Sequence, residues 1–293
     1  MCNRHGRRRV LECVRDIHYG PGEMASTENT TPTKPKTLNR PLRKFVKKRG
    51  KRAMRWASRV QSRASLVPDT PFVETDHFPF LAEFEDKWDA MRDEVRGILR
   101  HREAIPGFEE VSPDQYRIAQ SQKWKTFVLY GFGQRLEKNA RQAPVTAEIL
   151  SRVPNVQTAW FSILAPGYHI PAHTGVTKGI LRAHLGLIIP TEREKCRIRV
   201  DDEIRAWEAG KVIVLDDTYE HEVWNDTDEE RVILLFDFDR PMSWRGRMLN
   251  RIMLGLMKFT AFYQEPKKNL ADFEARFEAA TRRADENLEK LSD

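Results

Sequence analysis

The chain has few cysteines and no long apolar run, and both absences limit what it can be. Its three cysteines, Cys2, Cys13 and Cys196, are widely separated and odd in number, which argues against a disulfide framework or a structural zinc site. No stretch approaches eighteen consecutive apolar residues, so we predict no membrane-spanning helix. The N-terminus lacks the apolar stretch and cleavage site of a secretory signal. Together these absences predict a protein of the reducing cytosol, with at most peripheral membrane contact.

Acidic residues are missing from one segment, since none occurs between Glu28 and Asp69. The whole chain has 50 Lys and Arg against 43 Asp and Glu, so much of its basic excess belongs to this segment. Apolar residues from Leu42 to Ala64 recur at intervals of three and four, which predicts a basic amphipathic helix. Such a helix suits an anionic membrane surface or a nucleic acid, and the charge run alone does not decide between them.

The composition, with 40% hydrophobic residues, is ample for a core, and the pattern changes along the chain. The four predicted regions are a disordered leader and linker (residues 1–41), a basic amphipathic segment (42–70), a β-rich domain with N-terminal helices (72–242) and C-terminal helices (243–293). In the last region an apolar stripe runs from Met248 to Tyr263. We expect this stripe to pack on the domain, with lipid contact as the alternative.

Short runs typical of β-strands begin at Trp160 and alternate with turn signals. The runs are AWFSIL, RAHLGLIIP, CRIRV, KVIVLDD and RVILLFDFD. Many short strands at such regular spacing predict a mainly β fold made of two sheets, with helices flanking it.

Two histidines and two arginines in this region have the chemistry of a metal and co-substrate site. His173 ends a strand-like run, and His221 lies in the segment LDDTYEHEVW. Neutral imidazole is a good iron ligand, and two such ligands leave positions open for a bidentate co-substrate and oxygen. Arg182 and His184 alternate on one strand and therefore face the same side. Arg182 or Arg231 could hold the far carboxylate of a dicarboxylic co-substrate, although each of these residues alone is more often structural.

The segments GYHIPAHTGVTKGILRAHLGLIIP and CRIRVDDEIRAWEAGKVIVLDDTYEHEVWNDTDEERVILLFDFDRP closely resemble the aspartyl/asparaginyl β-hydroxylase family. The likeness runs across most of residues 72–242. It implies a double-stranded β-helix, or jelly roll, and an iron(II)-dependent dioxygenase that uses 2-oxoglutarate and O₂. By the same resemblance His173 and His221 bind iron. The positions that match 2-oxoglutarate ligands are Ser162, Arg182, His184 and Arg231.

One position departs from the commoner dioxygenase pattern. Those enzymes carry an acid two residues after the first histidine, where this chain has Gly175. The resemblance implies that water fills the third ligand position, because this branch of dioxygenases tolerates the absence. Asp217, four residues before His221, is predicted to orient an imidazole.

The substrate is not fixed by the resemblance, which covers enzymes that hydroxylate Asp or Asn in proteins and bacterial enzymes that hydroxylate lipid A or ornithine lipids. We expect a lipid acyl chain, because residues 42–64 and the stripe from Met248 could rest on an anionic membrane. This places the enzyme in the cytoplasm, peripherally on the inner face of the cytoplasmic membrane. Hydroxylation of a protein or peptide is the alternative. A third hypothesis, from another class, is a non-catalytic nucleic-acid-binding β-domain.

Overall fold

The computed structural model describes residues 40–115, 117–119, 121–257 and 269–283. The chain falls into two compact units, residues 1–46 and 47–293, and the features below belong to the second, apart from residues 40–46 at the start of the first helix. Helix α1 (Arg40–Ala64) covers the predicted amphipathic segment and begins two residues earlier. Residues 1–39 of the predicted leader lie outside the described residues. Within the described part of the chain, no helix combines the length and hydropathy needed to cross a bilayer.

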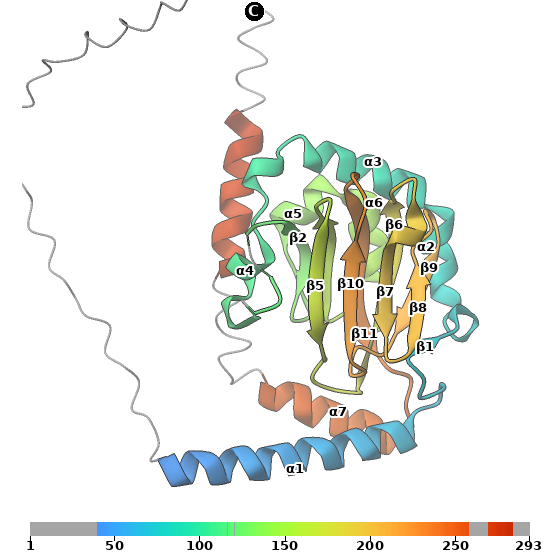
Figure 1. The fold of residues 1–293 in the computed structure, drawn as a ribbon, viewed down its shortest axis with the longest axis vertical. Helices are drawn as coiled ribbons and strands as arrows, with labels where there is room; N and C mark the ends of the chain where they lie inside the picture. Colours follow the sequence, from blue (N-terminus) through green and yellow to red (C-terminus); the bar gives the residue numbers. More distant parts are fainter. Residues whose placement is uncertain (1–39, 116, 120, 258–268, 284–293) are drawn as a thin grey trace, which may run out of the picture. The chain divides into compact units, whose positions relative to one another are not determined.

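Two antiparallel sheets form the core of the second unit (Figure 1). The larger sheet has the strand order β1-β9-β6-β11-β4-β2-β3, with β1 Phe72–Val73, β9 Val212–Leu215, β6 Ile180–Ile188, β11 Arg231–Asp239, β4 Thr158–Leu164, β2 Trp124–Gly131 and β3 Gln134–Arg135. The smaller has the order β5-β10-β7-β8, with β5 Tyr168–His173, β10 His221–Asn225, β7 Cys196–Val200 and β8 Glu203–Ala206. From β4 to β11 most connections cross between the sheets, as in a jelly roll, so the predicted fold is confirmed.

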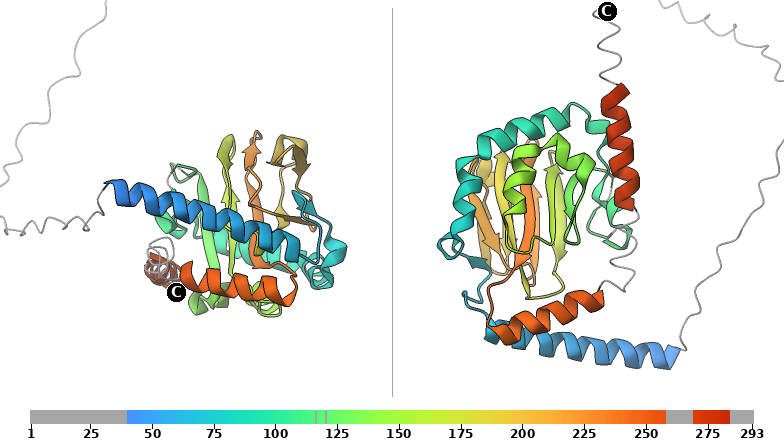
Figure 2. Two further views of the ribbon diagram at one scale, coloured as in Figure 1. Left: turned by 90° about the horizontal axis from the view of Figure 1, so that it is seen from below. Right: turned by 180° about the vertical axis from the view of Figure 1, so that it is seen from behind.

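Helices cover the outer face of the larger sheet, opposite the smaller sheet (Figures 1 and 2). The α-helices after α1 are α2 Ala82–Asp86, α3 Trp88–Leu99, α4 Phe108–Val111, α5 Glu137–Gln142, α6 Pro144–Ser151 and α7 Trp244–Met257, and residues 269–283 are also helical. Single 3-10 turns lie at residues 75–77, 79–81, 102–104, 113–115 and 193–195. The apolar periodicity over residues 81–101 predicts one helix, but the backbone leaves helical geometry at Lys87 (φ −111°, ψ 13°) and divides it into α2 and α3.

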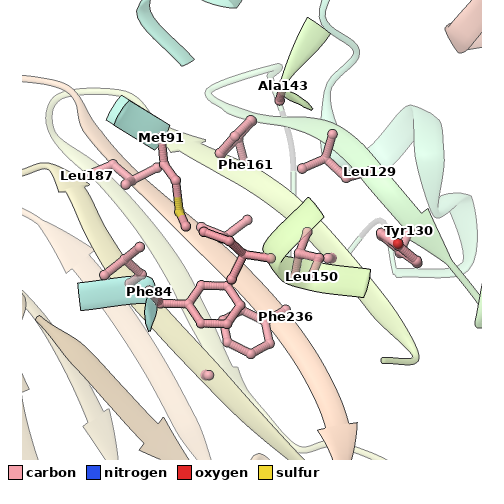
Figure 3. Packing of buried hydrophobic residues seen from close by; sticks show 14 of the residues in the cluster. Phe84, Met91, Leu129, Tyr130, Ala143, Leu150, Phe161, Leu187 and Phe236 are labelled. Atoms are coloured by element: carbon pink, nitrogen blue, oxygen red, sulfur yellow. The ribbon is translucent and has the colours of Figure 1, made fainter. Parts of the chain in front are cut away.

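Two apolar layers hold these elements together. Between helices and sheet, Phe84 of α2 stacks on Phe236 of β11 with ring centroids 4.6 Å apart, and Met91 of α3 packs in the same cluster (Figure 3). Between the two sheets, Ile198 of β7 meets Ile233 of β11 in a second cluster. The larger sheet is therefore covered on both faces at β11, by helices on one side and by the smaller sheet on the other. This explains why the residues of β11 form a nearly continuous apolar run.

The predicted packing of the C-terminal apolar stripe is wrong for a large part of α7. Gly246, Asn250 and Met253 are buried, whereas Met248 and Ile252 are more than half exposed. The buried and the exposed residues lie on opposite sides of the helix, so α7 has apolar side chains facing solvent as well as apolar side chains facing the domain. The end of the predicted stripe, from residue 258 onward, lies outside the described residues.

The stacked pair Phe84 and Phe236 gives a test of the core. Because both rings are fully buried, Phe236→Ala leaves a cavity and is expected to lower the free energy of unfolding by about 3–5 kcal/mol. Ile204→Ala removes an exposed side chain (59%) and should change it by less than about 0.5 kcal/mol. Urea denaturation measures both, and equal effects would contradict the packing described here.

Candidate active site

His173 and His221 lie directly opposite each other on neighbouring strands of the smaller sheet. The antiparallel register of β5 and β10 pairs the two residues, and their ring centroids are 4.1 Å apart with the planes inclined by 53°. His173 Nδ1 lies 2.8 Å from the Pro171 carbonyl oxygen, and His221 Nδ1 lies 3.0 Å from the Tyr219 carbonyl oxygen. A neutral ring can make such a bond only as the donor, so in both rings the proton lies on Nδ1. Both Nε2 atoms are left with a lone pair for a ligand.

Burial keeps both imidazoles neutral. Burial lowers the pKa of His173. It also lowers the pKa of His221, to about 3, and the neighbouring His173 ring lowers the pKa of His221 further in the same direction. Metal binding requires the unprotonated ring. The pair is therefore ready for a metal ion at neutral pH without first losing a proton.

All six residues predicted for the site border one cavity between the two sheets, which we call the inner cavity. They are Ser162, His173, Arg182, His184, His221 and Arg231. The six come from β4, β5, β6, β10 and β11, so only the closing of one sheet over the other brings them together. Trp124 and Trp207 also border this cavity, and no prediction from the sequence included them.

Arg231 is a buried cation without a paired anion. Its side chain is 2% exposed, its guanidinium carbon lies 4.8 Å from the centre of the Trp207 ring, and Nε has no hydrogen-bond partner in the described part of the chain. It forms no ion pair with any residue that the structure describes. Burial lowers the pKa of Arg231 to about 10, so the group remains charged at neutral pH. An unpaired buried charge is costly, which indicates that an anion completes this site.

His184 and Ser162 add two further donors to the inner cavity. Trp207 Nε1 donates to His184 Nδ1 at 3.4 Å, so the neutral ring carries its own proton on Nε2, which is buried without a partner in the described chain. Burial, with Arg182 and Arg231 nearby, holds the pKa of His184 well below its usual value. Trp124 Nε1 donates to Ser162 Oγ at 2.9 Å, which leaves the hydroxyl proton to donate elsewhere. With Arg231 they form a set of donors suited to a carboxylate.

Arg182, in contrast, already has an acid partner. Its Nε and Nη2 donate to the two carboxylate oxygens of Asp237 at 2.7 and 2.9 Å, and Nη2 also lies 3.4 Å from Asp217. Burial alone would lower the pKa of Arg182, but these two carboxylates outweigh it and raise the pKa. Asp237 faces Arg182 in the β6–β11 register. A sequence signal for it existed, since it is an acid inside the apolar run RVILLFDFD.

Gly175 leaves room for the carboxylate of Asp217. A Cβ at Gly175 would lie only 2.1 Å from Asp217 Oδ1, and the Gly175 N–H donates to the Asp217 carbonyl at 2.6 Å. Burial raises the pKa of Asp217 to about 6 against the influence of Arg182, and Oδ1 has no hydrogen-bond partner among described residues. Within the same residues no group of three or more His, Cys, Asp or Glu is arranged to hold a metal. The donor set for a metal is thus the two histidines.

A second, larger cavity of about 290 Å³ adjoins the first, and we call it the outer cavity. His173, Arg182 and Trp124 border both. The remaining lining residues are Phe108, Gln115, Arg117, Ile118, Trp160, Thr174, Gly175, Val176 and Asp217. A molecule in the outer cavity would therefore lie against His173, within a wall that combines aromatic and aliphatic residues with polar and charged ones.

Comparison with known proteins shows which family the chain is similar to. Residues 85–241 match the family model described as aspartyl/asparaginyl beta-hydroxylase. An ornithine lipid ester-linked acyl 2-hydroxylase from Rhizobium tropici is 39% identical over 224 residues, which cover 76% of this chain and 80% of that protein. The human aspartyl/asparaginyl beta-hydroxylase is 34% identical over 57% of this chain, but the match spans only 22% of the human protein. A solved Pseudomonas putida prolyl-4-hydroxylase aligns with a TM-score of 0.34 and 18% identity, covering 53% of this chain and 88% of that one.

The contact between Gly175 and Asp217 can be tested by a double-mutant cycle. Gly175→Ala should cost about 1–3 kcal/mol of stability, because its methyl group overlaps a carboxylate that has little room to move. In an Asp217→Ala background the cost should fall by at least about 1 kcal/mol. Gly97→Ala is the control, since a Cβ there would meet no described atom within 4 Å beyond its chain neighbours and the backbone of its own helix. Equal costs in the two backgrounds, measured by denaturation, would refute the contact.

Proposed function

Because the chain belongs to the aspartyl/asparaginyl β-hydroxylase family, we propose that it is an iron(II)- and 2-oxoglutarate-dependent dioxygenase that hydroxylates an acyl chain of an ornithine-type membrane lipid. The observation that carries the proposal is the inner cavity, where two neutral histidines lie beside an unpaired buried cation. The lipid substrate is supported by the match to the Rhizobium tropici enzyme over most of both chains. Hydroxylation of Asp or Asn in a protein is the alternative, supported by the shorter match to the human enzyme.

The histidine pair fits iron(II) bound by two protein ligands. Ring nitrogens lie about 2 Å from a bound metal, and the two rings are close enough to share one ion through Nε2. When bound, iron supplies the oxygen activation that converts 2-oxoglutarate to succinate and carbon dioxide and places a hydroxyl group on an unactivated carbon. His173 and His221 thus hold the metal, and the open positions remain for the co-substrates and water.

We assign the far carboxylate of 2-oxoglutarate to Arg231 and Ser162, with His184 donating into the same inner cavity. Arg231 is favoured over Arg182 because it has no acid partner among the described residues, and a planar guanidinium pairs well with a carboxylate. Arg182 is a positioning residue in this assignment, since Asp237 holds its guanidinium between the two cavities. Asp217 borders the outer cavity together with His173, and its carboxylate fills the space that Gly175 leaves open.

The outer cavity suits an acyl chain. Phe108, Trp124 and Trp160 give it an aromatic wall, and Val176 extends the apolar surface toward solvent. Arg117 is exposed at the same cavity, where it can contact a polar headgroup. We propose that the enzyme works peripherally on the inner face of the cytoplasmic membrane, with residues 42–64 contributing positive charge. Nucleic-acid binding would leave the six residues around the inner cavity without a role.

The proposal predicts turnover of 2-oxoglutarate to succinate that depends on both histidines. Purified protein with iron(II), 2-oxoglutarate, oxygen and detergent-dispersed ornithine lipid should form succinate and carbon dioxide and add one oxygen atom to an acyl chain, as mass spectrometry would detect. His173→Ala or His221→Ala should abolish both products, because one imidazole cannot hold the metal in place.

His169→Ala is the matched control, because His169 lies on the same strand but stacks on Trp224 and is bonded to Glu222 at the surface. Its turnover should equal that of the wild type. Succinate formation that survives in both metal-site variants would sink the assignment. An oxygen added to an Asp- or Asn-containing peptide and not to the lipid would favour the alternative substrate.

A second prediction concerns Arg231. Arg231→Lys keeps a positive charge but loses the paired hydrogen bonds, so KM for 2-oxoglutarate should rise at least about tenfold with a smaller change in kcat. The control Arg199→Lys changes an arginine that pairs with Glu222 and Glu220 on the smaller sheet and should leave KM unchanged. An unaltered KM in the Arg231 variant would remove it from the co-substrate site.

A further inference from the structure

We propose that the exposed apolar stripe of α7 docks the protein on an anionic lipid bilayer and holds the loop after His173 next to that surface. The inference rests on the proposed function only for the reason why the protein would bind a membrane, namely that its substrate is a lipid. The stripe consists of Trp244, Met248, Ile252 and Leu256, which are exposed by 61, 53, 54 and 64%. Their spacing of four residues places them in one row along the helix. We call this row the α7 stripe.

Exposed apolar side chains are concentrated in this part of the molecule. Eight large apolar residues of the described chain are exposed, and four of them form the α7 stripe. Trp56 and Leu66 belong to α1 and the segment that follows it, and Val176 belongs to the loop after His173. Only Ile204, on β8, lies elsewhere. Because a contiguous apolar surface marks an interaction site, this clustering indicates a docking face.

The charge around the stripe identifies the partner as an anionic membrane. Arg245, Arg247 and Arg251 are exposed on the same helix, and the sequence contains no acid between Asp239 and Glu265. The neighbouring helix α1 adds exposed arginines and no acid; they are Arg52, Arg55, Arg59 and Arg63. Apolar side chains flanked only by cations are typical of helices that lie in the interface of a membrane with negative headgroups. A second copy of this chain would bring the same positive charge and would be repelled.

The C-terminal part of α1 meets α7 at one end of the sheets (Figures 1 and 2). A Cβ at Gly246 would lie 2.6 Å from the Ala64 Cβ, so glycine allows the two helices to approach closely. The Ser243 N–H also donates to the Ala64 carbonyl at 2.8 Å. Residues far apart in the sequence therefore form one basic and apolar face.

A buried polar cluster joins this face to the candidate active site. Gln61 of α1 bonds to Asn250 of α7 at 3.2 Å and to Thr177 at 3.1 Å, and Asn250 Nδ2 donates to the Gly179 carbonyl at 3.0 Å. Thr177 and Gly179 lie in the loop of residues 174–179, which begins directly after His173 and whose first residues line the outer cavity. Docking of α7 would thus hold a wall of the outer cavity against the membrane, where an acyl chain enters.

Vesicle sedimentation with the full chain tests the docking face without iron or turnover. The probes are phosphatidylcholine vesicles with and without phosphatidylglycerol. Wild-type protein should bind the anionic vesicles, and Met248→Glu/Ile252→Glu should bind them at least about tenfold more weakly, because two carboxylates replace apolar anchors. Ile204→Glu is the control, since it places a carboxylate at an equally exposed apolar site on β8 and should bind like the wild type. Thermal unfolding checks that the variants are folded.

Equal vesicle binding by the double variant and the wild type would overturn the proposal. Failure of the wild-type protein to bind anionic vesicles would also overturn it. The same holds if the stripe instead mediates a dimer, which would be seen as a wild-type dimer that dissociates in the double variant. Hydroxylation assays separate the docking proposal from the catalytic proposal. The double variant should hydroxylate detergent-dispersed lipid like the wild type but lose hydroxylation of lipid in vesicles. Vesicle binding by a protein that forms no succinate would support the docking face while rejecting the proposed reaction.

Discussion

The candidate active site depends first on the antiparallel register of β5 and β10. That register places His173 opposite His221, and a shift by one residue would turn one ring to the other side of the sheet. The backbone carbonyls of Pro171 and Tyr219, each two residues before its histidine, then fix both rings by the same type of hydrogen bond. The sheet therefore sets the positions of the rings, and the local chain sets their orientation.

Two arginines near the histidine rings, on neighbouring strands, differ in whether the protein neutralises their positive charge. On β6 the charge of Arg182 is satisfied within the protein by Asp237 and Asp217. On β11 the charge of Arg231 is buried against Trp207 and left for a ligand. One arginine at this cavity is thus paired within the protein, and the other forms no ion pair with the described residues. In the proposed function, a dicarboxylate would supply the missing negative charge without disturbing the first pair.

Much of this site could be predicted from the sequence, because the chemistry resides in residue types that stand out in apolar strands. The six residues around the inner cavity were all named from motif and resemblance, and five strands were visible as short apolar runs. Trp207 could not be assigned, since its contact with His184 arises only when the sheets close. The preference for Arg231 over Arg182 also needed the partner Asp237, which is known only from the strand register. The exposure of the α7 stripe was hidden because apolar spacing does not show which side of a helix meets the domain.

The hydrogen bonds at Nδ1 of His173 and His221 have a consequence for how the protein matures. Both rings are held by the chain's own carbonyls, and the two apolar layers that stabilise the sheets do not include them. We therefore expect the chain to fold without a metal, unlike a zinc finger, whose fold exists only with its metal. If iron binds to the two histidines as proposed, its binding would be reversible, and a chelator would abolish activity while leaving the protein folded.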